Sequence, residues 1–233
     1  KPIVVQTRNT AANSINAVRS IVPTKEQTAF YDSLRAAADH LRTNTPEGRR
    51  RVIVIISDGE DTNSEGVIRA IWNAERKITS NVSNAELRQL RVKARDTAKV
   101  QEQVRVLKSL QDADTVLYSI NPAGSSYQLN SMSQFGQENL QKFADETGGT
   151  AFLPRFAPID TPDNYLNANN TRKNTEILEQ IFRQLASELR AQYLLQYYSE
   201  GEFPEGKFVR LNVGLNTRPE LKVRARQGYY VKN

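Results

Sequence analysis

The sequence predicts an α/β protein, with a doubly wound, mostly parallel sheet covered by helices on both faces and an antiparallel β meander at the C-terminus. Three observations carry this prediction. Residues 51–57 form a continuous β-branched run, which is typical of a parallel strand buried on both faces. Strand-type and helix-type patterns alternate up to about residue 190, as they do in doubly wound sheets. Beyond residue 190 only strand-type runs separated by turn residues follow, which predicts a meander.

The elements before the central run are predicted from apolar spacing and helix caps. Residues 2–6 form a short apolar run that predicts a strand. Residues 10–22 place their apolar side chains on one helical face, and Pro23 ends that helix. Residues 28–42 repeat the pattern, so a second helix is expected before a turn at 44–48.

The loop at residues 58–64 follows the central run directly. Open α/β sheets bind their ligands at the carboxyl ends of the strands, so this loop is the first place to expect a site. Taken alone, Asp58 is explained as a turn residue that precedes Gly59. The neighbouring Glu60 and Asp61 are expected to face solvent.

The second half of the chain continues the alternation of helices and strands. Residues 64–78, which include Trp72, predict one helix. Ser83 is the expected cap of a long helix at 84–111, part of which is expected to project from the domain. The remaining predicted elements are a strand at 114–120, a helix that ends at residue 147 before Gly148, a strand at 150–153, a surface loop at 154–170, a helix at 174–190, and strands at 192–198, 207–215 and 221–231.

The composition excludes several classes of site. A hydrophobic fraction of 38% and a charged fraction of 25% fit a soluble globular protein, as one large domain or one domain with an appendage. The absence of cysteine excludes disulfides, thiolate metal sites and cysteine nucleophiles. His40 is the only histidine, which argues against a histidine-rich metal site or a Ser-His-Asp triad. No apolar run in the sequence approaches the roughly 18 residues of a transmembrane helix.

The net charge of +6 raises nucleic acid or an acidic surface as partners. The basic residues are spread along the chain, however, and acidic residues interleave with them between Arg88 and Lys108. This pattern is more typical of solvated helix faces than of a binding patch. Nucleic acid is therefore not the expected partner, although DNA binding through the long basic helix is kept as a hypothesis that salt-dependent binding would support. Association with a membrane surface stays open.

Four stretches of sequence, in order along the chain, resemble a known family. They are TAFYDSL at 28–34, RRVIVIISDGEDT at 50–62, FADETGG at 143–149, and a tail containing YLLQYY at 193–198 and RARQGYY at 224–230. Together they resemble the von Willebrand factor A-type (vWA) domain, and most closely the vWA-related domain described from Acidobacteria. The resemblance covers most of the chain and implies a protein-binding module.

The same resemblance implies a metal site. The domains of this family hold a divalent cation, Mg²⁺ or Ca²⁺, at the metal-ion-dependent adhesion site above the sheet, where hydroxyl and carboxylate oxygens suit a hard ion. Thr28 and Asp58 match two of the family's ligand positions. The Asp-x-Ser-x-Ser motif that supplies the other ligands does not occur in these residues. The resemblance thus implies a chain that begins after the family's first strand, metal loop and first helix, with an incomplete cation site.

The expected organisation follows from these patterns. Residues 1–190 are expected to form an N-terminally incomplete vWA-like domain with a helical insertion at about 66–98, and residues 191–233 a β extension packed on it. No catalytic or cofactor-binding residue stands out. The expected function is a non-catalytic protein-binding or scaffold module in an extracytoplasmic assembly, either periplasmic or secreted. Two alternatives are a metal-dependent adhesion protein, once the missing segment is included, and a metal-assisted hydrolase that uses the acids around Asp58.

Overall fold

The computed structural model describes most of the chain in two compact units. The described residues are 11–22, 27–78, 82–122, 131–199, 201–217, 221 and 223–231. One unit comprises Lys1–Ala37 and Asp61–Glu102, and the other comprises Ala38–Glu60 and Gln103–Asn233. The strand predicted at 2–6 lies outside the described residues.

The first unit is helical. It contains α1 (Ala11–Arg19), the first half of α2 (Phe30–Asn44), α3 (Glu65–Glu75) and most of α4 (Asn84–Asp112). These helices confirm the helical predictions for this part of the chain, with ends that differ by up to a few residues. The buried apolar side chains of the unit come from α2, α3 and α4, and they are Phe30, Tyr31, Leu34, Val67 and Ala98.

The long helix α4 begins with a capping box. The Glu86 N–H donates to the Ser83 hydroxyl at 3.2 Å, and the Ser83 N–H donates back to the Glu86 carboxylate at 2.8 Å. The hydrogen bond from the Ser83 backbone, followed by the one from its hydroxyl, holds the pKa of Glu86 below its usual range. This reciprocal pair satisfies N–H groups that have no acceptor within the first turn of the helix. It confirms the predicted cap at Ser83.

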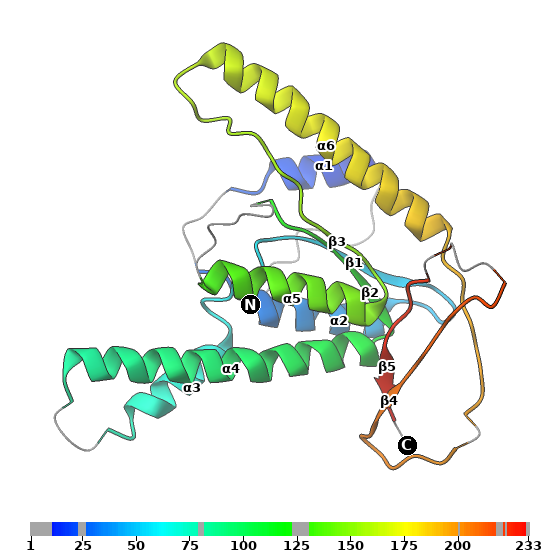
Figure 1. Ribbon diagram of the computed structural model, residues 1–233, viewed down its shortest axis with the longest axis horizontal. Helices are drawn as coiled ribbons and strands as arrows, with labels where there is room; N and C mark the ends of the chain where they lie inside the picture. The colour runs from blue at the N-terminus through cyan, green and yellow to red at the C-terminus, as the bar shows by residue number, and fades with distance from the viewer. Residues whose placement is uncertain are drawn as a thin grey trace. The chain divides into compact units, whose positions relative to one another are not determined.

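The second unit is built on a parallel sheet (Figure 1). Its elements are β1 (Arg51–Ile56), β2 (Thr115–Ile120), α5 (Ser131–Thr147), β3 (Ala151–Phe152), α6 (Asn164–Arg190), β4 (Phe208–Arg210) and β5 (Gly228–Tyr230), together with the last turns of α2 and α4. The described sheet has the order β1-β2-β3, and both strand pairs are parallel. The predicted α/β class and the parallel pairing of the central strands are therefore confirmed.

Helices α5 and α6 cover opposite faces of this sheet (Figure 1). On one face, Tyr118 of β2 belongs to an apolar cluster with Ile181 and Leu185 of α6. On the other face, the Ser119 hydroxyl of β2 donates to the Leu140 carbonyl of α5 at 3.5 Å. Successive side chains of β2 thus enter two different layers, and this explains why a continuous apolar run suits the strand.

Strand β1 departs from the prediction of burial on both faces. Its Val54 and Ile56 side chains are 43% and 61% exposed, whereas Val52 is partly buried against the cluster under α6. The exposed side chains share one face of the strand, because they alternate with the half-buried Ile53 and Ile55, and β1 lies at the edge of the described sheet. A hydrophobic run shows that a strand can be buried, but its neighbours decide whether it is.

The segment after β3 is more helical than predicted. Helix α6 begins at Asn164, so the prediction of a surface loop at 154–170 is wrong for residues 164–170. The Asp163 side chain caps the helix by accepting from the N–H groups of Tyr165 and Leu166. Asn174 accepts from the Ala157 N–H at 2.8 Å and so ties the helix to the preceding loop. The asparagines that suggest a loop in the sequence serve here as helix caps and loop clamps.

The C-terminal tail holds a smaller sheet than predicted. Strands β4 and β5 pair antiparallel, with Val209 opposite Tyr229. They occupy three residues each of the strands predicted at 207–215 and 221–231. The segment 192–198 is not a strand, so the predicted three-stranded meander is wrong. Its residues have strand propensity, but they pair with no described strand.

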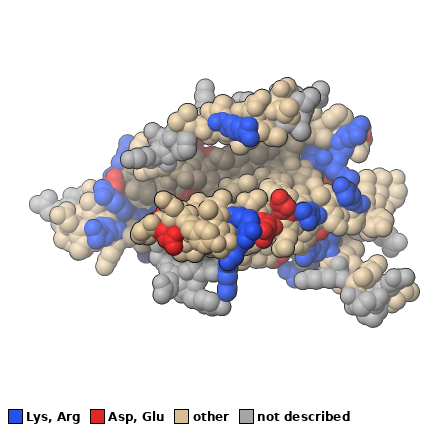
Figure 2. Space-filling view, turned by 90° about the horizontal axis from the view of Figure 1, so that it is seen from above, with Lys and Arg blue, Asp and Glu red and all other residues tan. Residues whose placement is uncertain are grey.

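The charged side chains of the surface are dispersed. On the face drawn in Figure 2, Lys and Arg side chains stand at several separate places with Asp and Glu among them. Exposed ion pairs such as Arg91–Glu75 and Arg183–Glu179 neutralise part of the positive charge locally. This dispersal agrees with the predicted solvated helix faces. None of the described helices combines the length and the hydropathy that crossing a membrane requires.

A polar cluster fastens the C-terminal tail to α6. The Arg224 guanidinium donates to Glu188 at 2.9 Å, and the Thr150 hydroxyl donates to the same carboxylate at 2.6 Å. Burial alone would raise the pKa of Glu188, but the hydrogen bonds from Thr150, Gln184 and Arg224 outweigh it and hold the pKa below the ordinary value of 4.5. The ionised form of Glu188 is therefore the one that stabilises the fold.

Substitution of Glu188 should reveal this dependence on pH. Because the pKa is lowered on folding, the stabilisation is fully present above about pH 4.5 and is lost as the pH falls through the folded-state value. We expect Glu188→Gln to lower the Tm at neutral pH, and the difference from wild type to shrink towards zero near pH 3. Glu179→Gln, which removes an exposed pair on the same helix, is the control. A constant difference at all pH values would contradict the expectation.

Candidate functional site

The two predicted metal ligands fall in different compact units. Thr28 belongs to the helical unit, where its carbonyl accepts from the N–H groups of Thr62 and Asn63, each at 2.9 Å. Asp58 belongs to the unit of the parallel sheet, where it is exposed and accepts from the Glu60 N–H at 3.0 Å. Among the described residues, no three His, Asp or Glu side chains are grouped so that they could hold a metal ion. Thr28 and Asp58 are only two of the ligands that the vWA resemblance implies, and a bound divalent cation stays a prediction.

Glu60 and Asp61 do not face solvent, so the prediction for these two acids is wrong. Asp61 is buried, and Glu60 is half-buried and accepts a hydrogen bond from the Ser133 hydroxyl at 2.5 Å. An isolated buried carboxylate is costly, so it persists only where several donors satisfy it. The donors around Asp61 therefore define a buried polar site within the described helical unit.

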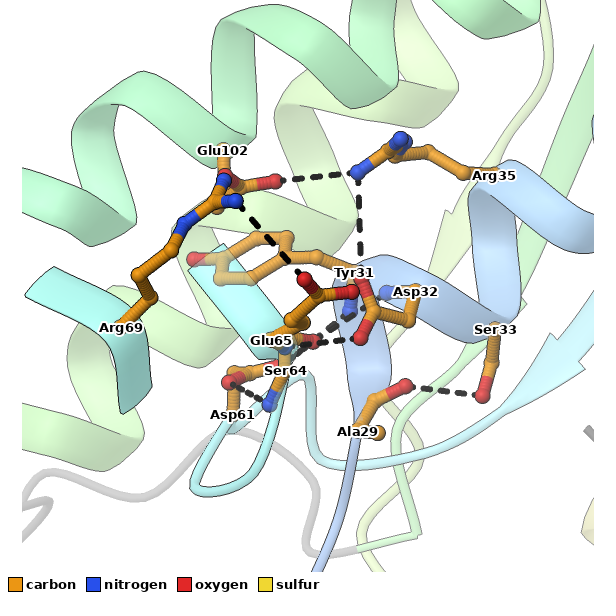
Figure 3. Close-up of polar contacts among 10 residues, drawn as sticks. All are labelled: Ala29, Tyr31, Asp32, Ser33, Arg35, Asp61, Ser64, Glu65, Arg69 and Glu102. Atoms are coloured by element: carbon orange, nitrogen blue, oxygen red, sulfur yellow. Dashed lines mark hydrogen bonds and ion pairs between the residues drawn. The ribbon is translucent and has the colours of Figure 1, made fainter. Parts of the chain in front are cut away.

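Asp61 caps the N-terminus of α2 from a distant point in the sequence (Figure 3). Its carboxylate accepts from the Tyr31 N–H at 3.1 Å, from the Ser64 N–H at 3.1 Å and from the Ser64 hydroxyl at 2.5 Å. The Ser64 hydroxyl in turn accepts from the Asp32 N–H at 3.1 Å. Tyr31 and Asp32 lie in the first turn of α2, where N–H groups have no partner within the helix.

The capping is reciprocal. The Asp32 carboxylate, on α2, accepts at 2.8 Å from the N–H of Glu65, which is the first residue of α3. Helix α2 thus places the Asp32 carboxylate at the start of α3, and the loop that leads into α3 places the Asp61 carboxylate and the Ser64 hydroxyl at the start of α2. The helix dipole also favours negative charge at both places. The loop that ends at Ser64 is held by this exchange, and α2 and α3 are fixed to one another within the unit.

A buried acid on α4 extends the network. Arg35 of α2 lies 3.5 Å from the Glu102 carboxylate and 3.8 Å from the Asp32 carboxylate (Figure 3). A Cβ on Gly66 would lie 2.0 Å from the Glu102 carboxylate, so glycine leaves the room that this acid occupies. The half-exposed Arg35 guanidinium therefore bridges two acids and links α2 to α4.

The chemistry open to this network is limited by burial. Asp61 and Ser64 form a carboxylate–hydroxyl pair, which in a cleft would suggest an activated nucleophile. Both residues are almost completely buried, and the hydroxyl is occupied by Asp61 and by the Asp32 N–H. The described contacts of this pair hold the starts of α2 and α3 in place.

Sequence reasoning identified only part of this network. Ser64 stands just before a predicted helix, and this is a recognisable capping signal. The contacts by which Asp61, Asp32 and Glu102 join the helices carry no such local signal, because each of these contacts is made to a residue far away in the sequence.

Comparisons with known proteins leave the family open. A search of protein-family models, a search of curated proteins and a search of solved structures each find no match to this chain.

Proposed function

We propose that this chain is a non-catalytic protein-binding or scaffold module of the vWA type, with a doubly wound fold, in an extracytoplasmic assembly. One observation carries the binding role. The six residues 193–198, which we name the docking segment, expose their apolar and aromatic side chains to solvent, with exposed fractions of 52% to 91% for the three tyrosines and two leucines. The vWA resemblance and the parallel sheet between α5 and α6 support the choice of module.

The docking segment has the composition of a binding surface. Large exposed apolar groups that adjoin one another mark interaction sites more often than scattered ones do. Tyrosine dominates the energetic centres of protein interfaces, because it buries a large rigid ring and keeps a hydroxyl for hydrogen bonding. The segment carries no charge, so docking would desolvate no ion.

One end of the docking segment is anchored. The Gln192 side chain donates to the Tyr118 hydroxyl at 3.0 Å and accepts from the Arg50 guanidinium at 3.3 Å. The Arg50 guanidinium also donates to the Leu189 carbonyl at 2.5 Å. The segment therefore leaves a fixed point on the sheet unit, which lowers the conformational entropy that binding would cost.

Site-specific photocrosslinking tests the proposal. With benzoylphenylalanine in place of Tyr198, which is 91% exposed, we expect crosslinked protein products when the chain is irradiated in an extract of its native cells. The matched control carries the same group in place of Tyr165, which is 85% exposed at the start of α6. Absence of products at position 198, or equal products at both positions, would refute a docking role for the segment.

A further inference from the structure

The loop after β1 contains a pair of residues with a chemistry of its own. Asp58-Gly59 is the only Asp-Gly pair in the sequence, which has no Asn-Gly pair. In an Asp-Gly pair the glycine nitrogen can attack the side-chain carbonyl carbon of the aspartate, because glycine has no Cβ to obstruct the approach. Asp58 is exposed, so water and protons reach its carboxyl group. The pair therefore has the composition and the exposure of a site of aspartate isomerisation.

Water is the only co-reactant that this isomerisation needs. A bond forms between the Gly59 nitrogen and Asp58 Cγ while the nitrogen loses its proton and the carboxyl group loses a hydroxyl, so that water leaves and a succinimide ring remains. Water then opens the ring. Addition at the Cγ carbonyl restores aspartate, whereas addition at the backbone carbonyl gives isoaspartate, in which the main chain runs through Cγ. The product has the same mass as the original chain.

Two hydrogen bonds of the loop oppose the attack. The Gly59 N–H donates to the Ser57 hydroxyl at 3.0 Å, which holds the proton that the nitrogen has to lose. The Asp58 carboxylate accepts from the Glu60 N–H at 3.0 Å, which restricts its rotation. Ring closure needs a deprotonated nitrogen and a carboxyl group that can turn towards it, so each hydrogen bond lowers the rate.

Helix α5 holds the backbone of the same loop. Gly59 is buried with a φ of +77°, and a Cβ on it would lie 2.1 Å from the Gly136 carbonyl oxygen of α5. Ser133, also on α5, donates from its hydroxyl to the Glu60 carboxylate at 2.5 Å. The succinimide ring forms only after the Asp58-Gly59 backbone has rotated, and this close contact resists that rotation. The reaction therefore requires the loop to open locally from α5.

We propose that Asp58 is a latent isomerisation site, which the native loop protects and which becomes reactive when the loop leaves α5. This inference goes beyond the proposed function and does not rest on it. Isoaspartate adds one carbon to the main chain at a point where the backbone of α5 lies close, so the modified loop cannot restore its contact with Gly136. The reaction also moves the carboxylate that the vWA resemblance assigns to a cation.

Peptide mapping after incubation tests the protection. The wild-type chain is incubated folded and in guanidinium chloride, and isoaspartate is located by electron-transfer fragmentation of the tryptic peptide 52–69. We expect isoaspartate at residue 58 in the unfolded chain and a rate at least about tenfold lower in the folded chain, because the folded chain reacts only through local opening. Equal rates in the two states, or an unfolded chain without isoaspartate at residue 58, would overturn the inference.

A pair of serine variants tests how the loop is protected. Ser57→Ala removes the acceptor of the Gly59 N–H, so the folded-state rate, divided by the unfolded-state rate, should rise about two- to tenfold, the factor that one hydrogen bond represents. The matched control is Ser199→Ala in the same compact unit, where the exposed hydroxyl donates to the Gly201 carbonyl at 3.0 Å. The control should react as the wild type does. Circular dichroism establishes that each variant is folded during the incubation, and equal ratios in the two variants would contradict protection by Ser57.

Refolding tests the consequence of the modification. The chain that carries isoaspartate at residue 58 is separated from the aspartate form after incubation in denaturant, and both are returned to native buffer. We expect the isoaspartate form to have the lower Tm, because its longer main chain does not fit against Gly136. Identical Tm values would show that α5 does not constrain the loop, and the proposed protection would then be wrong.

Discussion

Replacing Gly59 with alanine is expected to lower the free energy of unfolding by about 3 kcal/mol or more. Gly59 has a φ of +77°, a left-handed conformation that costs a residue with a Cβ about 1 kcal/mol. The added Cβ would also lie 2.1 Å from the Gly136 carbonyl oxygen. That oxygen belongs to the backbone of α5, so it cannot move aside as a flexible side chain could. Urea denaturation measures the loss.

Gly48 supplies a matched control for this prediction. Its φ is +73°, and nothing lies within 4 Å of the Cβ that alanine would add. Gly48→Ala should therefore cost only the backbone term of about 1 kcal/mol, and the excess at Gly59 measures the contact with Gly136. The corresponding substitution on the α5 side of the contact, Gly136→Ala, should lower the free energy of unfolding by a similar amount, because its Cβ would lie 2.6 Å from the Asp58 carbonyl oxygen. Equal losses at Gly48 and Gly59 would show that α5 does not contact the loop this closely.

The Gly59 contact illustrates what the sequence could and could not predict. The Asp58-Gly59 pair after a strand indicates a tight turn, and the structure has that turn with the left-handed glycine. The sequence does not show that α5 passes against the turn, since Gly136 gives no local signal of a backbone approach. The central strands and most helices were predictable because apolar periodicity is a local property.

The errors of prediction share one physical cause. The run at 51–56 and the docking segment both have strand chemistry, yet the first lies at the edge of the described sheet and the second pairs with no described strand. Pairing depends on neighbours that composition does not specify. The same reasoning applies to Asp61. An acid in a polar loop normally faces water, and only the N–H groups at the start of α2 make its burial favourable.

Substitution of Asp61 with alanine is the second prediction with a large expected effect. The change removes the acceptor for three hydrogen bonds and leaves buried donors on Tyr31 and Ser64 without it. Loss of a helix cap costs about 1 kcal/mol, and each buried donor left unsatisfied costs about 1–3 kcal/mol. We therefore expect a loss of about 2–4 kcal/mol in the free energy of unfolding. Asp61→Asn, which keeps one acceptor oxygen, should lose less.

Asp58→Ala is the natural control, because it changes the same residue type three positions earlier in the loop. Asp58 is exposed and accepts from the Glu60 N–H, so its loss should cost only about 0.5 kcal/mol. A double-mutant cycle with Ser64→Ala then tests whether Asp61 and Ser64 act as one cap. If they do, the double variant should be clearly less destabilised than the sum of the two single variants, since either change alone already disrupts the shared cap. Additive losses, or a larger loss at Asp58 than at Asp61, would mean that the buried network does not hold α2 and α3 together. The expected result assigns the two aspartates different roles in the fold, because Asp61 fixes the helices and the exposed Asp58 contributes little to stability.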